Sequence, residues 1–182
     1  DVETVWQWTL TKCMHNFGPY EDAMTTRSVQ LFHGRLSGLM NLHRLLPKRV
    51  VEDVLALDVP INSKEGFVRQ VVGWREFVRH IHRETDGFRK VPLGKPGCTR
   101  PSMGTEGPLR KAMELPEAYW TGDSGYRCLD HVVQEVWNEG YTHHINRLMV
   151  LANWGTLLGA SPEGLSDWFW VAFEDAYDWV VE

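Results

Sequence analysis

The sequence predicts an all-α protein, and three observations support this fold class. Apolar residues recur mostly three or four positions apart rather than in alternation, and strand signals are nearly absent. The chain has 182 residues, of which 43% are hydrophobic and 24% charged, which suits one compact domain with a sizeable core. No internal repeat is present. We therefore expect about six to eight helices packed on one another.

Three helices are predicted in the first half of the chain. The apolar spacing of residues 31–46 predicts one helix, and the proline that follows ends it. Pro47 then opens a second helix that runs through Leu57. Asn62–Glu65 resembles a capping box, so a third helix is expected from there to about Arg83.

Residues 87–108 separate the two halves, and five glycines and four prolines predict a loop there. Beyond the loop, one helix is expected from near Ser124 to just before Gly140. A second is expected over 141–159. A third follows Ser161–Pro162, which is a good N-cap and first-turn pair.

Composition narrows the class of protein. The formal charge of −5 argues against a chain that coats nucleic acid, although no Lys or Arg follows Arg147 and a local basic face stays possible. Three scattered cysteines are too few for a disulfide framework. No apolar run is long enough to span a membrane and no signal peptide is visible, so we expect a cytoplasmic monomer. The missing initial Met and a helical pattern that continues to Glu182 predict a fragment.

The run Gly140–Met149 sets two imidazoles and a guanidinium at the start of an otherwise apolar helix. On such a helix His144 shares a face with Arg147, whereas His143 points about 100° away. The spacing therefore predicts that the two histidines do not form one chelate. His144 is either a satisfied core imidazole or a proton donor to a bound molecule, and the spacing leaves both interpretations open.

Aromatic residues are unusually frequent. Most of the tryptophans must be buried, and a core of large side chains explains them individually. As a set, indoles packed in series can also pass electrons to a redox cofactor or form flat walls for an isoalloxazine or a base. The nine are Trp6, Trp8, Trp74, Trp120, Trp137, Trp154, Trp168, Trp170 and Trp179.

The segment Glu65–Phe77 places Trp74 and Arg75 in the middle of a predicted helix with apolar surroundings. A guanidinium there needs an anion or several acceptors. A structural pair with a carboxylate and a contact to a phosphate or flavin are the two alternatives.

Several motifs together resemble a known superfamily. Gly73–Phe77 reads Gly-Trp-Arg-Glu-Phe, which resembles a helix of the photolyase and cryptochrome superfamily. Phe17–Met24, Tyr119–Asp123, Tyr141–Met149 and Asp175–Val180 resemble, more narrowly, the iron–sulfur bacterial cryptochromes and prokaryotic (6-4) photolyases, also described as deoxyribodipyrimidine photolyase-related proteins. Each motif alone is modest evidence for this resemblance, but together they occur in the right order over nearly the whole chain outside the Gly/Pro loop.

This resemblance implies that residues 1–182 are part of a helical FAD-binding domain of the photolyase/cryptochrome type. An N-terminal antenna domain with its chromophore and a C-terminal part that completes a [4Fe–4S] site would lie outside the chain. The implied reaction is light-driven electron transfer from reduced FAD to a pyrimidine photoproduct flipped out of damaged DNA, with no net redox change, as in a carbon–carbon lyase.

The resemblance also implies roles for individual residues. His144 matches the active-site proton donor, with His143 in support, and Trp74 matches a lesion-facing position. Trp168, Trp120 and Tyr177 match aromatics of the photoreduction route, although Phe169 stands where a tyrosine is usual. The matches to flavin-contacting positions are Tyr20, His33, Gly34, Arg35, Leu36, Ser37, Gln70, Arg75, Arg147 and Asp175.

Cys128 matches the first of four thiolate ligands of the family's [4Fe–4S] cluster, and the other three would lie beyond Glu182. One thiolate cannot hold a cubane, so we expect no ordered cluster in this fragment and a free thiol or an adventitious metal site at Cys128. Cys128 and His131 have helical metal-ligand spacing but supply only two ligands.

Two further function classes stay open. One is a cryptochrome-type blue-light sensor with the same flavin pocket and no repair activity. The other is a flavin-free helical interaction module, which the net negative charge favours. Contact with DNA phosphates would use a stretch that has more basic than acidic side chains. The alternative is that this stretch is an ordinary solvated helix face. The basic residues are Arg75, Arg79, Arg83, Arg89 and Lys90.

Overall fold

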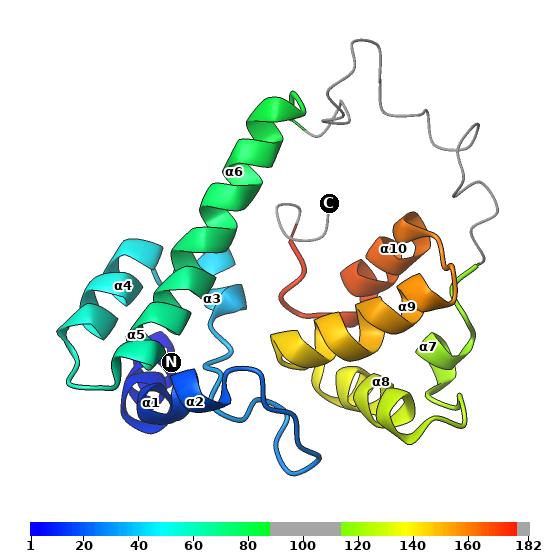
Figure 1. The fold of residues 1–182 in the computed structure, drawn as a ribbon, viewed down its shortest axis with the longest axis horizontal. Helices are drawn as coiled ribbons and strands as arrows, with labels where there is room; N and C mark the ends of the chain where they lie inside the picture. Colours follow the sequence, from blue (N-terminus) through cyan, green and yellow to red (C-terminus); the bar gives the residue numbers. More distant parts are fainter. Residues whose placement is uncertain (88–113, 178–182) are drawn as a thin grey trace.

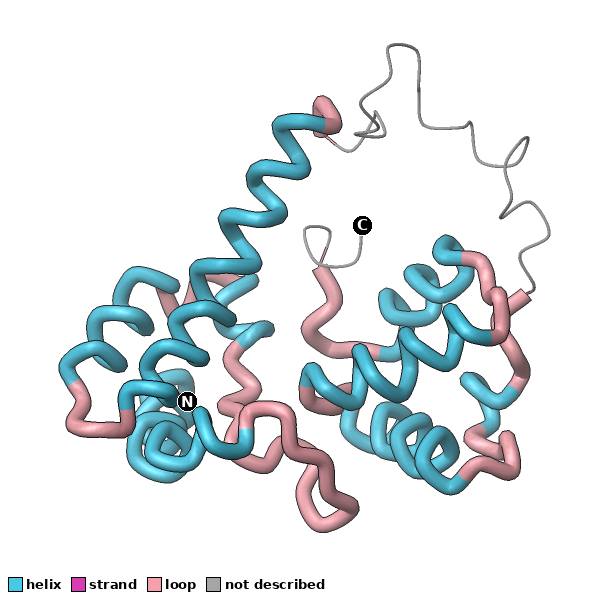
Figure 2. The backbone as a smooth tube through the Cα atoms, viewed as in Figure 1, coloured by secondary structure: helices cyan, strands magenta, loops and turns pink. Residues whose placement is uncertain are grey.

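The computed structural model describes residues 1–87 and 114–177, and its helices form two groups (Figure 1). No strand occurs in either described range, so the all-α prediction is confirmed (Figure 2). The first group contains α1 (Val2–Trp8), η1 (Thr9–Cys13), α2 (Met14–Tyr20), α3 (Ser37–Asn41), α4 (Pro47–Ala56), α5 (Ile61–Val68), η2 (Arg69–Gly73) and α6 (Trp74–Glu84). The second contains α7 (Ala118–Thr121), α8 (Arg127–Glu139), η3 (Asn146–Ala152), α9 (Asn153–Leu157) and α10 (Pro162–Ala172).

Each group has its own hydrophobic core. Trp6, Val50 and Phe67 are buried in the first, and the Trp6 indole N–H donates to Asp53 Oδ2 at 2.8 Å, which satisfies its polar atom. Trp168 and Val133 are fully buried in the second. Trp6 and Trp168 thus contribute to the cores, but the prediction that most of the tryptophans are buried was wrong: among the described residues, the exposed ones are Trp8, Trp74, Trp120, Trp137 and Trp170.

Long helices in both groups contain wide, π-helical turns. The helix from α1 to α2 includes η1, the helix from α5 to α6 includes η2, and α9 continues from η3. π-Helical turns inside α-helices frequently mark functional sites. The turn η2 leads directly into the Trp74–Arg75 pair, and η3 contains Arg147.

Several predicted boundaries are confirmed. The helix opened by Pro47 runs to Ala56, and the one expected to reach about Arg83 ends at Glu84. Helix α8 ends at Gly140, whose φ of 60° is left-handed, as a C-terminal glycine predicts. Ser161 caps α10, since its side chain accepts a hydrogen bond from the backbone N–H of Gly164 at 2.8 Å.

Other predictions about helices were wrong. Residues 31–46 do not form one helix: Leu31, Arg35 and His43 have positive φ values of 46°, 47° and 55°, which a right-handed helix excludes, so only α3 is helical there. The apolar pattern arose because Leu36 and Leu45 are buried from an irregular segment.

The expected capping box is absent. Helix α5 begins at Ile61 without a side-chain cap, and Glu65 instead accepts from Arg69 at 2.7 Å. The helix expected from Tyr141 begins later, since Tyr141, Thr142 and His143 are not helical. The predicted loop at 87–108 lies outside the described residues except for Gly87.

The segment between α2 and α3 and the segment after α10 lie between the two groups (Figure 1). Arg35 forms an ion pair with Glu139 at 3.4 Å, and Asn41 donates to the backbone carbonyl of Asp175 at 3.2 Å. Polar contacts thus join groups that have separate cores. Within the described ranges, no helix has the length and apolar character needed to cross a bilayer.

Two glycines with opposite backbone geometry provide a stability test. Gly140 has a left-handed φ and its added Cβ would meet only ordinary contacts, so Gly140→Ala should cost about 1 kcal/mol of unfolding free energy from backbone strain. Gly73 is helical, with a φ of −60° and open space around its Cβ position, so Gly73→Ala should stabilise by about 0.5–1 kcal/mol. Chemical denaturation measures both. Equal shifts for the two variants would contradict the assigned backbone geometry.

Candidate functional site

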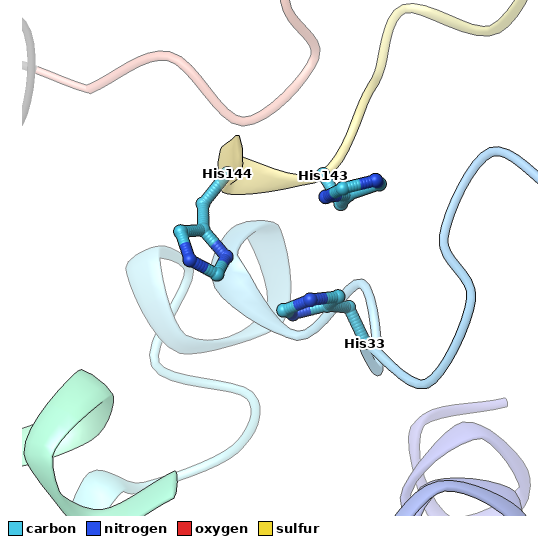
Figure 3. Close-up of side chains that lie close together, drawn as sticks. All are labelled: His33, His143 and His144. Carbon is cyan, nitrogen blue, oxygen red and sulfur yellow. The ribbon is translucent and has the colours of Figure 1, made fainter. Parts of the chain in front are cut away.

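Three histidines from distant parts of the chain meet between the two helix groups (Figure 3). His33 comes from the segment between α2 and α3, and His143 and His144 come from the entry to the helix that contains η3. The His33 and His143 rings are stacked, with centroids 5.1 Å apart and planes 3° apart. The His144 ring meets His33 edge-on at 4.8 Å.

This arrangement differs from the prediction that the spacing of His143 and His144 prevents them from forming one chelate. One ring nitrogen from each of the three histidines lies within 4.8 Å of the others. The prediction assumed a helical phase of 100° between the two residues, about one helix step. Because His143 precedes the helix, that phase does not apply, and its ring is free to turn toward His144.

Burial favours the neutral form of each histidine in the cluster. Burial, reinforced by the neighbouring His144, lowers the pKa of His33 to about 3. Burial, with further contributions from His144 and Arg147, lowers the pKa of His143 to about 4. Burial also lowers the pKa of His144, against the opposing effect of Asp22, whose carboxylate lies 3.4 Å from His144 Nε2. Neutral imidazoles keep one nitrogen lone pair each.

His143 is the least satisfied member of the cluster. It is fully buried, and neither ring nitrogen has a hydrogen-bond partner. An unmade hydrogen bond of a buried polar group costs about 1–3 kcal/mol. His33, by contrast, has its Nε2 2.9 Å from the backbone carbonyl oxygen of Glu21. The cluster therefore contains two buried ring nitrogens, both of His143, that form no hydrogen bond within the protein.

Next to the histidines, Asp175 organises a buried polar network. Arg147 donates from both terminal nitrogens to its two carboxylate oxygens, at 2.9 and 3.0 Å, and Ser37 donates to the same carboxylate. The Arg147 Nε donates to the carbonyl of Thr142 at 2.7 Å, which fixes the guanidinium further. Three residues predicted to contact flavin, Ser37, Arg147 and Asp175, are thus brought together.

Tyr141 lies between two guanidinium groups. The Arg35 guanidinium carbon is 4.3 Å from the ring centroid and that of Arg147 is 5.0 Å away. The buried Nε of Arg35 has no hydrogen-bond partner, although its terminal nitrogens reach Glu139. Arg35, another predicted flavin contact, therefore lies in the same region with one donor unused.

A second buried network was not predicted. Glu135 is 8% exposed and accepts a hydrogen bond from Thr142 at 2.5 Å, while Asn146 donates to Glu135 at 3.3 Å and to Thr142 at 2.8 Å. These residues fix the chain on both sides of the two histidines. A carboxylate on the inward face of α8 was the available signal, since buried acids need partners.

Gln70, Trp74 and Arg75 lie on the long helix of the first group. Gln70 donates to Glu21 at 2.7 Å and accepts from the Trp74 indole at 2.9 Å, so it orients the exposed ring. Arg75 donates to the carbonyl of Val71 at 2.7 Å, and its other terminal nitrogen is 3.7 Å from Met40 Sδ on α3. An open hollow of ≈ 350 Å³ lies beside Trp74, lined by Arg69, Gln70, Gly73, Trp74 and Phe77.

Three indoles form a continuous array from the core to the surface. Trp168 is fully buried, its ring centroid lies 6.2 Å from that of Trp137, and Trp137 lies 5.9 Å from Trp120, which is 50% exposed. Trp168 and Trp120 were predicted as electron carriers, but Trp137, which connects them, was not. Its position on α8, facing α7, was not evident from spacing. Tyr177 is partly exposed near the end of the described residues.

The remaining predicted site residues have no contact in common with the histidines or with Asp175 among the interactions described above. Tyr20 is half exposed and packs on Phe32, Leu36 is buried in the first core, and Gly34 lies against Thr9. Cys128 is exposed and free. Among the described residues, the three histidines are the one group with three or more side chains placed to hold a metal, and Cys128 is not part of it.

Comparison with known proteins gives one informative match. No family model matches the chain. The chain is 31% identical over 169 residues to a protein described as a (6-4) photolyase from Agrobacterium fabrum. The chain is similar to a (6-4) photolyase. The match covers 91% of this chain but 31% of that protein, so the chain spans less than a third of the relative's length. This similarity supports the photolyase resemblance that the motifs gave.

The Asp175 network is a test of what holds the site together. Asp175→Ala leaves the Arg147 guanidinium, 21% exposed, without its anion and should cost about 3 kcal/mol of unfolding free energy. Glu139→Gln removes the more exposed partner of Arg35 and should cost less than about 1 kcal/mol. Denaturant titrations of both variants measure the difference. If Asp175→Ala were as mild as its control, the network would not be a structural constraint.

Proposed function

We propose that this chain forms part of the FAD-binding domain of a light-driven DNA repair enzyme of the (6-4) photolyase type. The observation that carries the proposal is that Arg147, paired with Asp175, lies close enough to His144 to act on its charge, in a chain whose similarity to a (6-4) photolyase covers 91% of its length. Short helix α3 connects this place to Arg75 through Met40 and to Asp175 through Asn41.

The donor set suits a flavin nucleotide. Arg35 has an unused buried Nε, and Arg147 presents a guanidinium whose orientation Asp175 fixes. Gln70 in η2 and Arg75 in α6 add polar side chains whose positions are fixed by hydrogen bonds to Glu21 and to the carbonyl of Val71. When bound, reduced FAD supplies the light-excited electron. The residues of the chain bind and orient the cofactor, while a [4Fe–4S] cluster with Cys128 as one ligand and an antenna chromophore would belong to the longer protein.

His144 is proposed as the proton donor to the photoproduct. Its ring is partly exposed; burial lowers the pKa of His144, and the Asp22 carboxylate 3.4 Å from Nε2 offsets this in part by stabilising the protonated form. His143 and His33 lie beside it and exclude water from one side of the ring. Trp74, held by Gln70, is placed to face a flipped base, and the arginines of α6 to meet DNA phosphates.

His144→Ala should reduce repair by at least about 100-fold, because a positioned acid contributes that much to proton transfer, while flavin absorbance is retained. The measurement is the yield of repaired oligonucleotide carrying a (6-4) photoproduct under blue light, with the full-length protein. His15→Ala, which changes an exposed histidine on α2, is the matched control. Undiminished repair by the His144 variant would remove the proton-donor assignment.

The indole array is proposed to reduce the photoexcited flavin, with Trp137 as the intermediate carrier. Trp168→Phe and Trp137→Phe should each abolish most light-driven flavin reduction, because phenylalanine is much harder to oxidise than tryptophan. Transient absorption after blue-light excitation measures the rate. Trp154→Phe, whose ring packs on Tyr126, is the matched control and should leave the rate unchanged. Normal reduction in the Trp137 variant would assign the route to other aromatics, such as Trp170 or Tyr177.

The same assays separate the alternatives. Flavin photoreduction without repair of any pyrimidine photoproduct would identify a blue-light sensor. A colourless full-length protein that binds no FAD would identify a helical interaction module.

A further inference from the structure

The histidine cluster carries an inference that goes beyond flavin chemistry. We propose that His33, His143 and His144 form a binding site for one divalent transition-metal ion of the zinc class, with a fourth position open to water or another ligand. The three side chains offer one nitrogen each, and these nitrogens all lie within 4.8 Å of one another. Three histidines with an open fourth position are an established zinc ligand set.

The first argument is the convergence of the rings. In Figure 3 the three imidazoles surround a common space, with His143 on one side, His33 opposite and His144 across the opening. Zinc–nitrogen bonds of about 2.0–2.1 Å place tetrahedral ligand nitrogens roughly 3.3 Å apart. Imidazole nitrogens bind a metal in the plane of the ring, so binding requires His33 or His143 to turn out of the stacked arrangement and the nitrogens to move closer than the observed spacing.

The second argument is the set of contacts around the histidines. Metal-binding histidines usually direct their other nitrogen to a carbonyl or carboxylate, which fixes the ring. His33 Nε2 lies 2.9 Å from the carbonyl oxygen of Glu21, and His144 Nε2 lies 3.4 Å from the carboxylate of Asp22. Two adjacent residues thus hold the remote nitrogens of two rings and leave Nδ1 of each for another partner.

The third argument is the state of His143. It is fully buried, and both of its ring nitrogens are without a hydrogen-bond partner. Buried imidazoles ordinarily have partners. An ion bound in the plane of the His143 ring would supply one for a ring that the protein leaves unsatisfied, and if shared with His33 it would also join the segment before α3 to the second helix group.

Calorimetric titration of the metal-free full chain with Zn²⁺, in the dark and without flavin, tests the site. We expect one ion per chain, and at least about tenfold weaker binding in His33→Gln and in His144→Gln, since even changes to groups behind the ligands cost that much. His15→Gln is the matched control and should bind as the unsubstituted chain does. Absence of binding, or equal weakening by His15→Gln, overturns the proposal.

X-ray absorption of the unsubstituted, zinc-loaded chain keeps the test decisive if a variant fails to fold. Three imidazole scatterers at zinc–nitrogen distance support the site. Sulfur scattering, which would place the ion at Cys128, or fewer than three imidazoles, overturns it. Neither measurement involves light or DNA, so the metal site and the proposed repair function can fail independently.

Discussion

The ion pair between Asp175 and Arg147 is the interaction on which the rest of the site depends. Asp175 is 6% exposed, and a buried carboxylate is tolerated only when it is paired and hydrogen-bonded. Its partners come from two distant segments: Arg147 in η3, and Ser37 and Asn41 in α3. Satisfying this one group fixes the position of α3 against the second helix group.

The same requirement explains why the histidines meet. Arg147 also donates to the carbonyl of Thr142, the residue before His143, so the guanidinium that binds Asp175 also sets the backbone next to the cluster. On the other side, the segment that leads to Ser37 carries His33 toward the two rings. The groups have separate cores, and polar contacts rather than a shared apolar interface bring their functional residues together.

The sequence was informative where local rules decide the structure. Pro47, Gly140 and Ser161 mark helix ends correctly, because proline geometry, left-handed glycine and side-chain caps act over a few residues. Residues 31–46 misled because their apolar spacing is helical although the backbone turns at Leu31, Arg35 and His43.

Motif resemblance identified most of the residues that lie near Asp175, but it did not predict which of them contact one another. Helical phase placed His143 away from His144, because the start of the helix could not be located to one residue from spacing. Glu135 and Trp137 were missed for a related reason: both lie on α8, and what makes them important is which neighbouring element each faces. Those relations are set by tertiary packing.

One carbonyl oxygen in the second group binds two indoles of the array at once. The backbone oxygen of Tyr119 accepts hydrogen bonds from the indole N–H groups of both Trp137 and Trp168, each at 3.0 Å. Two aromatic rings on different helices are therefore tethered to a single peptide atom, which limits independent changes in their separation and tilt. Electronic coupling falls steeply with separation, so in the proposed electron route this shared acceptor would limit how much the coupling between the two indoles varies as the helices fluctuate.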